Sequence, residues 1–376
     1  MDPFGRAEVV MASKSRLRFI AAGVFAGAVL GQNTPKDAAV PSDPLEMVTG
    51  KVKPANTPAS REAVFDLLNR ARNSYVLRSA GTGYDLKVTF NVNSGGQTDF
   101  DGAWEMEDVF DPNQGLRWTA KTEGYSTIQI LSNQMAYGQA TANYIPLRLQ
   151  EARAALFDPI PAAANVERAF IRTSKAIFKG TQLTCVLLSR SGNAAARSSS
   201  RLWEETEECI DPQSGLLRVH SQIPGRYYAY DYSNAPQLAG RVLPRKVSVT
   251  EAGKKVSKIS VDSLTEISAA DAALFVPTEQ MKADGRAIMM AGSQKISRFA
   301  GPGPYAADAT AQPVCVFGLV TPTGQLVEAH SLQPTDPNSQ AAVEAAKQID
   351  FSNPPPIVGR PQQHFVFIIE KFVSSQ

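Results

Sequence analysis

The sequence predicts an α+β protein in which a long antiparallel β-sheet is followed by a small ββαβ unit. Two observations favour this fold class. Between residues 86 and 264 the chain is a succession of short strand-like runs, interrupted by one helical pattern at 146–157, and such successions are typical of antiparallel sheets. After a segment rich in Gly, Pro and Ala at 299–313, two strands, a helix and a strand close the chain.

The first elements are a helix and five strands. Thr57 is the expected N-cap of the helix and Pro58 its first residue, and apolar residues recur at helical spacing from there to Tyr75. In the run 86–92 apolar residues alternate with polar ones, which predicts a strand with one buried face. Four more strands are expected at 103–110, 116–123, 126–131 and 134–139.

A second strand series and a C-terminal unit follow the helix at 146–157. The strands of the series are expected at 166–178, 182–189, 201–210, 216–222, 226–232, 246–251 and 255–264. The C-terminal unit is expected to contain strands at 314–320 and 326–332, a helix beginning at Asp336, and a strand at 363–372.

The first 31 residues have the pattern of a secretory signal peptide. Lys14, Arg16 and Arg18 precede the apolar run 19–30, and cleavage is expected after Gly31. A helix of that run spans about 18 Å, well short of a hydrocarbon core of about 30 Å, which disfavours the alternative of an uncleaved membrane anchor. We therefore expect a periplasmic protein with a signal peptide at 1–31 and a flexible leader at 32–56.

Charge and motifs exclude several functional classes. The 38 Lys and Arg residues nearly cancel the 36 Asp and Glu residues, so no strong field attracts nucleic acid. The sequence holds no paired-His motif, nucleophile elbow or phosphate-binding glycine loop, and its three histidines, His220, His330 and His364, have strand-like neighbours. We predict a protein that is not an enzyme, with no catalytic residues, no metal site, no cofactor and no nucleic-acid partner.

Two of the three cysteines are placed to form a disulfide. Cys185 and Cys209 lie in strand-like runs on either side of a Ser/Ala/Gly-rich stretch at 189–200, which puts them on adjacent arms of a hairpin. Export to an oxidising compartment then predicts a bridge. The alternative, a metal pair, lacks a nearby His or third Cys. Cys315 is expected to be a buried core thiol.

Five apolar residues are predicted to share one face of the first strand series: Phe90, Trp104, Trp118, Ile128 and Ile130. Such a face is either a packed core or the lining of a lipid cavity, because both use the same residue types. The acidic run at 204–208 is expected to be a solvated strand edge, with cation binding or a basic partner as the alternative.

Residues 314–373 resemble the TonB C-terminal domain family. The matching parts are the hairpin 318–329 (GLV…GQLVEA), the helix 341–351 (AAVEAAKQIDF) and the closing strand 364–372 (HFVFIIEKF). The resemblance implies that family's fold and its pairing with a strand of a partner. Ile349 and Asp350 stand where the family usually has Trp and Arg, and no long Pro/Lys-rich spacer precedes the unit, so the resemblance does not extend to energy transduction.

Residues 57–277 are similar in layout to the LolA/LolB/LppX superfamily of lipoprotein and lipid carriers. The shared features are a leading helix, a run of antiparallel strands, an inserted helix and further strands. This resemblance implies a half-barrel, a strongly curved sheet with helices in its concavity that leaves apolar space for acyl chains. We accordingly expect a LolA-like domain at 57–298, a linker at 299–313 and a TonB-like domain at 314–376.

The function that these features favour is non-enzymatic binding in the periplasm. We expect the protein to hold a lipid or acyl chain and to dock to an envelope protein through its TonB-like domain. The alternative is a structural or adaptor protein whose β-domain is a solid core without a small-molecule ligand.

Overall fold

The computed structural model describes residues 47–48, 51–93, 100–133, 135–142, 145–189, 201–202, 205–284, 295–302, 314–320, 326–349 and 363–373. All of them belong to one unit, Asp37–Gln376. The predicted signal peptide lies outside the described residues and stays a prediction.

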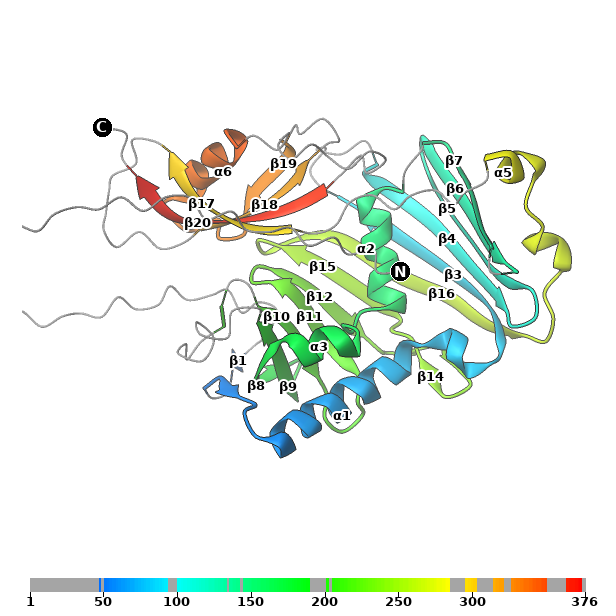
Figure 1. The fold of residues 1–376 in the computed structure, drawn as a ribbon, viewed down its shortest axis with the longest axis horizontal. Coiled ribbons are helices and arrows are strands. Elements are labelled where there is room, and N and C mark those ends of the chain that lie inside the picture. Colours follow the sequence, from blue (N-terminus) through cyan, green and yellow to red (C-terminus); the bar gives the residue numbers. More distant parts are fainter. Residues whose placement is uncertain are drawn as a thin grey trace, which may run out of the picture. The chain divides into compact units, whose positions relative to one another are not determined.

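One curved, open antiparallel sheet dominates the structure (Figure 1). From edge to edge its strands follow the order β1, β8, β9, β10, β11, β12, β15, β16, β3, β4, β5, β6, β7, and β2 also pairs with β8. The two predicted strand series therefore form a single sheet, joined where β16 pairs with β3. The strands are β1 (Met47–Val48), β2 (Lys53–Pro54), β3 (Gly83–Val92), β4 (Gly102–Asp111), β5 (Gly115–Thr122), β6 (Tyr125–Ser132), β7 (Met135–Ala140), β8 (Phe170–Phe178), β9 (Thr181–Ser189), β10 (Thr206–Ile210), β11 (Leu217–Ile223), β12 (Arg226–Asp231), β15 (Lys246–Glu251) and β16 (Lys254–Ile267). A small separate hairpin joins β13 (Gln237–Leu238) to β14 (Arg241–Val242).

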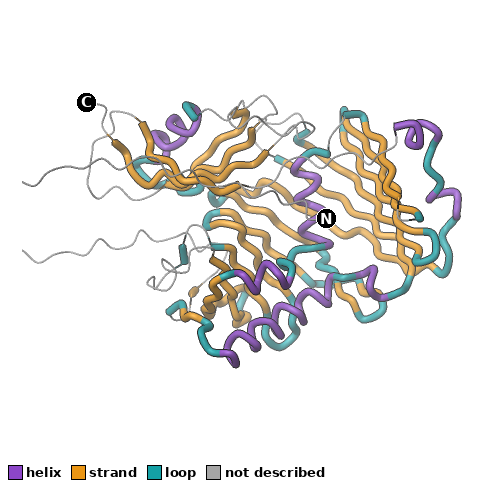
Figure 2. The backbone as a smooth tube through the Cα atoms, in the orientation of Figure 1, coloured by secondary structure: helices purple, strands orange, loops and turns teal. Residues whose placement is uncertain are grey.

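Three helices pack on one face of this sheet, and Figure 2 shows them against it: α1 (Pro58–Tyr75), α2 (Leu147–Phe157) and α3 (Ala163–Arg168). The start of α1 is as predicted, because the Thr57 hydroxyl accepts the Ser60 backbone N–H at 3.1 Å and Pro58 occupies the first turn. A short 3-10 helix, η1 (Leu77–Ala80), follows α1. Together the buried faces of the helices and the sheet form the main core.

The opposite face of the sheet has a smaller core of its own. A 3-10 helix, η2 (Ala272–Phe275), and α5 (Glu279–Asp284) cover part of β4 and β6 there. Phe275 and Met281 from these elements pack on Val109 and Ile130. The sheet is thus covered on both faces in this region, but by different parts of the chain.

The end of the chain forms a second sheet, in the order β17, β20, β18, β19. Its elements are β17 (Lys295–Pro302), β18 (Val314–Val320), β19 (Leu326–Ser331), α6 (Ser339–Lys347) and β20 (Gln363–Val373). β17 runs parallel to β20, and the other pairs are antiparallel. Ala342 and Ala346 of α6 pack on Val314 and Val316. Residues 299–302, which the sequence analysis assigned to a linker, belong to β17 in the structure.

Candidate functional site

The helix-covered face of β3, β4 and β5 carries an aromatic cluster. Phe90 and Trp104 are partners across β3 and β4, and their stacked ring centroids are 5.3 Å apart. Phe100 and Tyr125 extend the cluster, with centroids 5.3 Å from each other. Trp118 of β5 lies on the same face. The predicted residues Phe90, Trp104 and Trp118 are therefore together, and each is at most 3% exposed.

The structure corrects the other two members of the predicted face. In the pairing of β5 with β6, Gln129 is opposite Trp118, whereas Ile130 is opposite Arg117. Side chains alternate across a strand, so Ile128 and Ile130 lie on the face that η2 and α5 cover. The reason is the two-residue turn at 123–124, which makes Thr122 the partner of Tyr125 and fixes the register of the whole hairpin.

Helix α2 lies against the aromatic face with leucine and alanine side chains. Its residues buried there are Leu149, Ala152, Ala155 and Leu156. From α1, Leu68, Ala71 and Tyr75 complete the same core. Protein side chains therefore lie against Phe90, Trp104 and Trp118 in this structure, as expected of a packed core.

A buried polar cluster ties α2 to the sheet. Arg153 of α2 donates to the fully buried Asp108 of β4 at 2.9 Å, and its guanidinium lies 4.0 Å from the centre of the Trp118 ring. The Tyr84 hydroxyl donates to the same carboxylate at 2.8 Å. Burial lowers the pKa of Arg153 and, together with the nearby Asp108 charge, raises the pKa of Tyr84. A signal for Asp108 was present in the sequence, because it occupies the same strand parity as Trp104 and Met106.

A second polar cluster lies at the beginning of α2. Arg148 donates to Glu251 of β15 at 2.8 Å, and Arg226 of β12 donates to the same carboxylate at 2.7 Å. Glu151 of α2 lies 2.7 Å from Arg226. Burial alone would raise the pKa of Glu251, but the two guanidiniums hold it well below its usual range. These pairs join residues far apart in the chain, 103 positions for Arg148 and Glu251 and 25 for Arg226 and Glu251, and left no local signal in the sequence.

The second cluster also reaches the C-terminal sheet. Nε2 of His330 on β19 is 3.2 Å from a Glu251 oxygen. The Phe317 ring of β18 lies beneath the guanidinium of Arg226, 4.9 Å from its centre. Beside it, Cys315 and Leu332 pack with Ile223 of β11. The polar cluster at the beginning of α2 is thus continuous with the contact between the two sheets.

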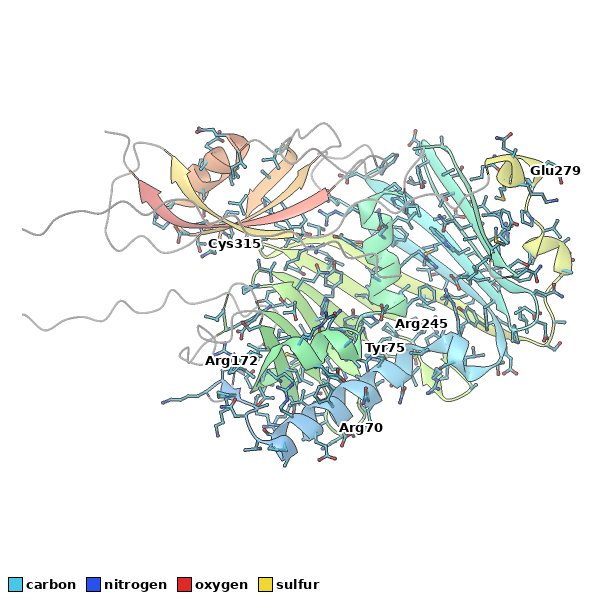
Figure 3. The ribbon with its side chains drawn as sticks, in the orientation of Figure 1. Arg70, Tyr75, Arg172, Arg245, Glu279 and Cys315 are labelled. Carbon is cyan, nitrogen blue, oxygen red and sulfur yellow. A yellow bond between two sulfur atoms is a disulfide. The ribbon has the colours of Figure 1, made fainter. Side chains whose placement is uncertain are left out.

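The acidic run is not a solvated edge. Glu205 and Glu208 are fully buried and Glu207 is 5% exposed, because β10 lies inside the sheet between β9 and β11. Each has a basic partner: Arg172 (Figure 3) contacts Glu205 at 2.8 Å, Arg201 contacts Glu207 at 2.8 Å, and His220 contacts Glu208 at 2.8 Å. Burial raises the pKa of Glu207 and of Glu208. Glu204 lies outside the described residues.

The cysteines are arranged as predicted. Cys185 and Cys209 are opposite each other on β9 and β10 and form a disulfide. The Glu207 carboxylate lies within 4.8 Å of both sulfur atoms, but sulfur in a disulfide is not the thiolate that a metal requires. Cys315 is a free, buried thiol (Figure 3), and burial raises its pKa.

The surface of the described residues has a wide groove and a smaller hollow. A groove of about 910 Å³ crosses the face of the sheet opposite the aromatic cluster. Its charges pair with one another: Lys121 with Glu105 at 2.8 Å, and Arg117 with Glu107 at 3.4 Å. A smaller hollow of about 420 Å³ lies between the β15–β16 turn and α6.

No helix among the described residues is long and apolar enough to cross a membrane.

Comparison with known proteins gives distant structural likeness only. No family model matches the chain, so the resemblance to the TonB family gains no support there, and no curated protein sequence matches it. Among solved structures, the chain is similar to a putative outer membrane lipoprotein-sorting protein domain from Vibrio parahaemolyticus, with 8% identity over 57% of this chain and 95% of the other and a TM-score of 0.32. A LolA superfamily protein from Nitrosomonas europaea gives the same identity, coverage of this chain and TM-score over 97% of its own length. MucB in complex with MucA is similar at 12% identity over 57% of this chain and 60% of the other, with a TM-score of 0.25. Likeness at these TM-scores supports no conclusion about function.

Proposed function

We propose that the protein is a non-enzymatic periplasmic binding protein that holds a lipid or acyl chain between the aromatic sheet face and α2. The observation that carries this proposal is that α2 covers the aromatic face with a limited apolar contact and is held to the sheet by ion pairs. Its apolar contact consists of two leucines, two alanines and the partly buried Phe157, and ionic clusters hold its first and second halves.

The energies of this contact favour a removable cover. Buried ion pairs add little net stability, because water solvates the separated charges well. Lifting α2 exposes Leu149 and Leu156, at a cost of about 1.5–3 kcal/mol for each, and also Phe157 and the aromatic face that the helix covers. An acyl chain gains about 0.8 kcal/mol for every methylene that it buries, so a chain of ordinary length between α2 and the face can offset the cost of separating them.

The second part of the proposal concerns a partner. We place docking to an envelope protein in the C-terminal sheet, whose β19 is an edge strand that a partner strand could extend. One observation favours the alternative, an adaptor without ligand: Phe90, Trp104 and Trp118 are at most 3% exposed.

Titration with a neutral fluorescent probe, N-phenylnaphthylamine, decides between the two. The carrier should bind the probe saturably, and Asp108→Asn, which removes the carboxylate that holds Arg153, should speed probe uptake. Glu105→Gln is the matched control, because it lies on the same strand in an exposed pair on the opposite face. If neither wild type nor Asp108→Asn binds the probe, and both retain the native far-UV circular dichroism, the adaptor function replaces the carrier.

A further inference from the structure

Two guanidiniums share one carboxylate at the end of the aromatic face. Nη2 of Arg153 is 2.9 Å and Nη2 of Arg78 is 3.8 Å from the same oxygen of Asp108. The third neighbour of this carboxylate, Tyr84, contributes a neutral hydroxyl. The cluster of two guanidiniums, one carboxylate and one neutral hydroxyl therefore has a net charge of +1.

No other acid of the described chain supplies the missing charge. The charged and polar groups with the largest effect on the pKa of Arg153 are Asp108, Arg78 and Tyr84. Of the two acids closest to Arg153 in the chain, Glu151 pairs with Arg148 and Arg226, and Asp158 interacts with Arg72. The Nε of Arg153 is buried and has no hydrogen-bond acceptor among the described residues. A buried donor without an acceptor is costly, and a ligand oxygen would remove that cost.

The excess charge lies where the apolar face meets solvent. The side chain of Arg153 is 18% exposed and that of Arg78 is 41% exposed. On the inner side, the Arg153 guanidinium covers the Trp118 ring and both guanidiniums lie over Phe157, at 5.4 and 5.8 Å. A group bound to both cations would therefore have apolar aromatic surface on one side and water on the other.

We infer that the ligand is an anionic amphiphile, with a carboxylate or phosphate head bound by Arg153 and Arg78 and an alkyl chain that enters between α2 and the face of Phe90, Trp104 and Trp118. This inference rests on the proposed function and specifies its ligand. Guanidinium groups suit both heads, because their N–H donors match the oxygens of carboxylate and phosphate in pairs.

Displacement of bound N-phenylnaphthylamine from the full-length protein tests the inference. Dodecanoate and dodecyl phosphate should displace the probe at concentrations about ten- to a hundredfold lower than dodecanol, as expected for charge-assisted hydrogen bonds to the head. Inorganic phosphate, which has no chain, should leave the probe bound. In Arg78→Gln and Arg153→Gln the preference for the anions over dodecanol should fall at least tenfold, whereas Arg117→Gln, paired with Glu107 on the other face, should keep it.

The outcomes separate this inference from the proposed function. Equal displacement by dodecanoate and dodecanol in wild type would overturn the anionic head and leave the apolar carrier standing. Displacement by inorganic phosphate alone would overturn the amphiphile. Failure of the probe to bind would overturn the carrier itself. Arg78→Gln alters a partly exposed side chain, so it tests the preference for an anionic head even if Arg153→Gln does not fold.

Discussion

Asp108 is a fully buried carboxylate on a sheet face that is otherwise aromatic and aliphatic. A lone carboxylate there would be protonated or would unfold the region, since burying an unpaired charge is very costly. Two guanidiniums and a tyrosine hydroxyl replace the water that it loses. The residue thus makes the position of α2 depend on charge as well as on apolar packing.

Asp108→Asn should lower the free energy of unfolding by about 3 kcal/mol, because it leaves the buried Arg153 without its counter-ion. Chemical denaturation at neutral pH measures the change. Glu105→Gln on the same strand should have no measurable effect, since its pair with Lys121 is exposed. Equal unfolding free energies for the two variants would contradict the role of Asp108.

Glu251 predicts a specific dependence of stability on pH. Its pKa is lower in the folded than in the unfolded protein, so its contribution is fully present above the unfolded value of about 4.3 and is lost as the pH falls towards the folded value. Denaturation curves between neutral pH and pH of about 3 should show this loss. Glu251→Gln should be less stable at neutral pH and should lose less on acidification; an unchanged acid slope would contradict the assignment.

Among the elements, β10 shows what a sequence pattern can conceal. Its dense glutamates predict exposure, but its position between β9 and β11 buries them beside Arg172, Arg201 and His220. Arg172 and His220 lie on other strands, β8 and β11, so no local pattern could reveal these two partners. By contrast, the α1 cap and the alternation in β3 were readable, because both depend on neighbours in the chain. The turn at 123–124 also held readable register information, which would have placed Ile130 correctly.

The disulfide joins β9 and β10 at the same place in the sheet. Removing it by Cys185→Ala with Cys209→Ala should lower the free energy of unfolding by roughly 3 kcal/mol, since the bridge closes a loop with a sequence separation of 24. Thiol titration of denatured, unreduced wild type should count one free thiol, Cys315. A count of three would contradict the bridge.

At the scale of the whole molecule, the close contact between the two sheets depends on a residue without a side chain. Gly225, in the turn between β11 and β12, has a φ of +86°, and a Cβ there would lie 2.7 Å from the Leu332 Cβ and 2.9 Å from its carbonyl oxygen. The C-terminal sheet, in the order β17, β20, β18, β19, includes one strand, β17, that the sequence did not predict. Its contact with the main sheet was not predictable, because it joins residues far apart in the chain.

Gly225→Ala should loosen this contact and expose Cys315, so a thiol reagent should modify the native protein at least about tenfold faster, the effect of about 1.4 kcal/mol. Gly180→Ala is the matched control, because it has a similar positive φ of +72° but no neighbouring atom within 4 Å of the added carbon. Equal modification rates in the two variants would show that the clash with Leu332 does not control the contact.

The burial of Cys315 has a consequence for folding in an oxidising medium. A chain with three thiols can form three bridges, and the correct one closes by far the shortest loop, which entropy favours. Once the main sheet covers Cys315 of the second sheet, its thiol can no longer attack the bridge, and the raised pKa further reduces the reactive thiolate. In molecules whose two sheets have not yet associated, the Cys315 thiol is exposed and can still take part in disulfide exchange. Association of the two sheets therefore ends disulfide exchange by Cys315, so the Cys185–Cys209 bridge becomes permanent only in fully folded molecules.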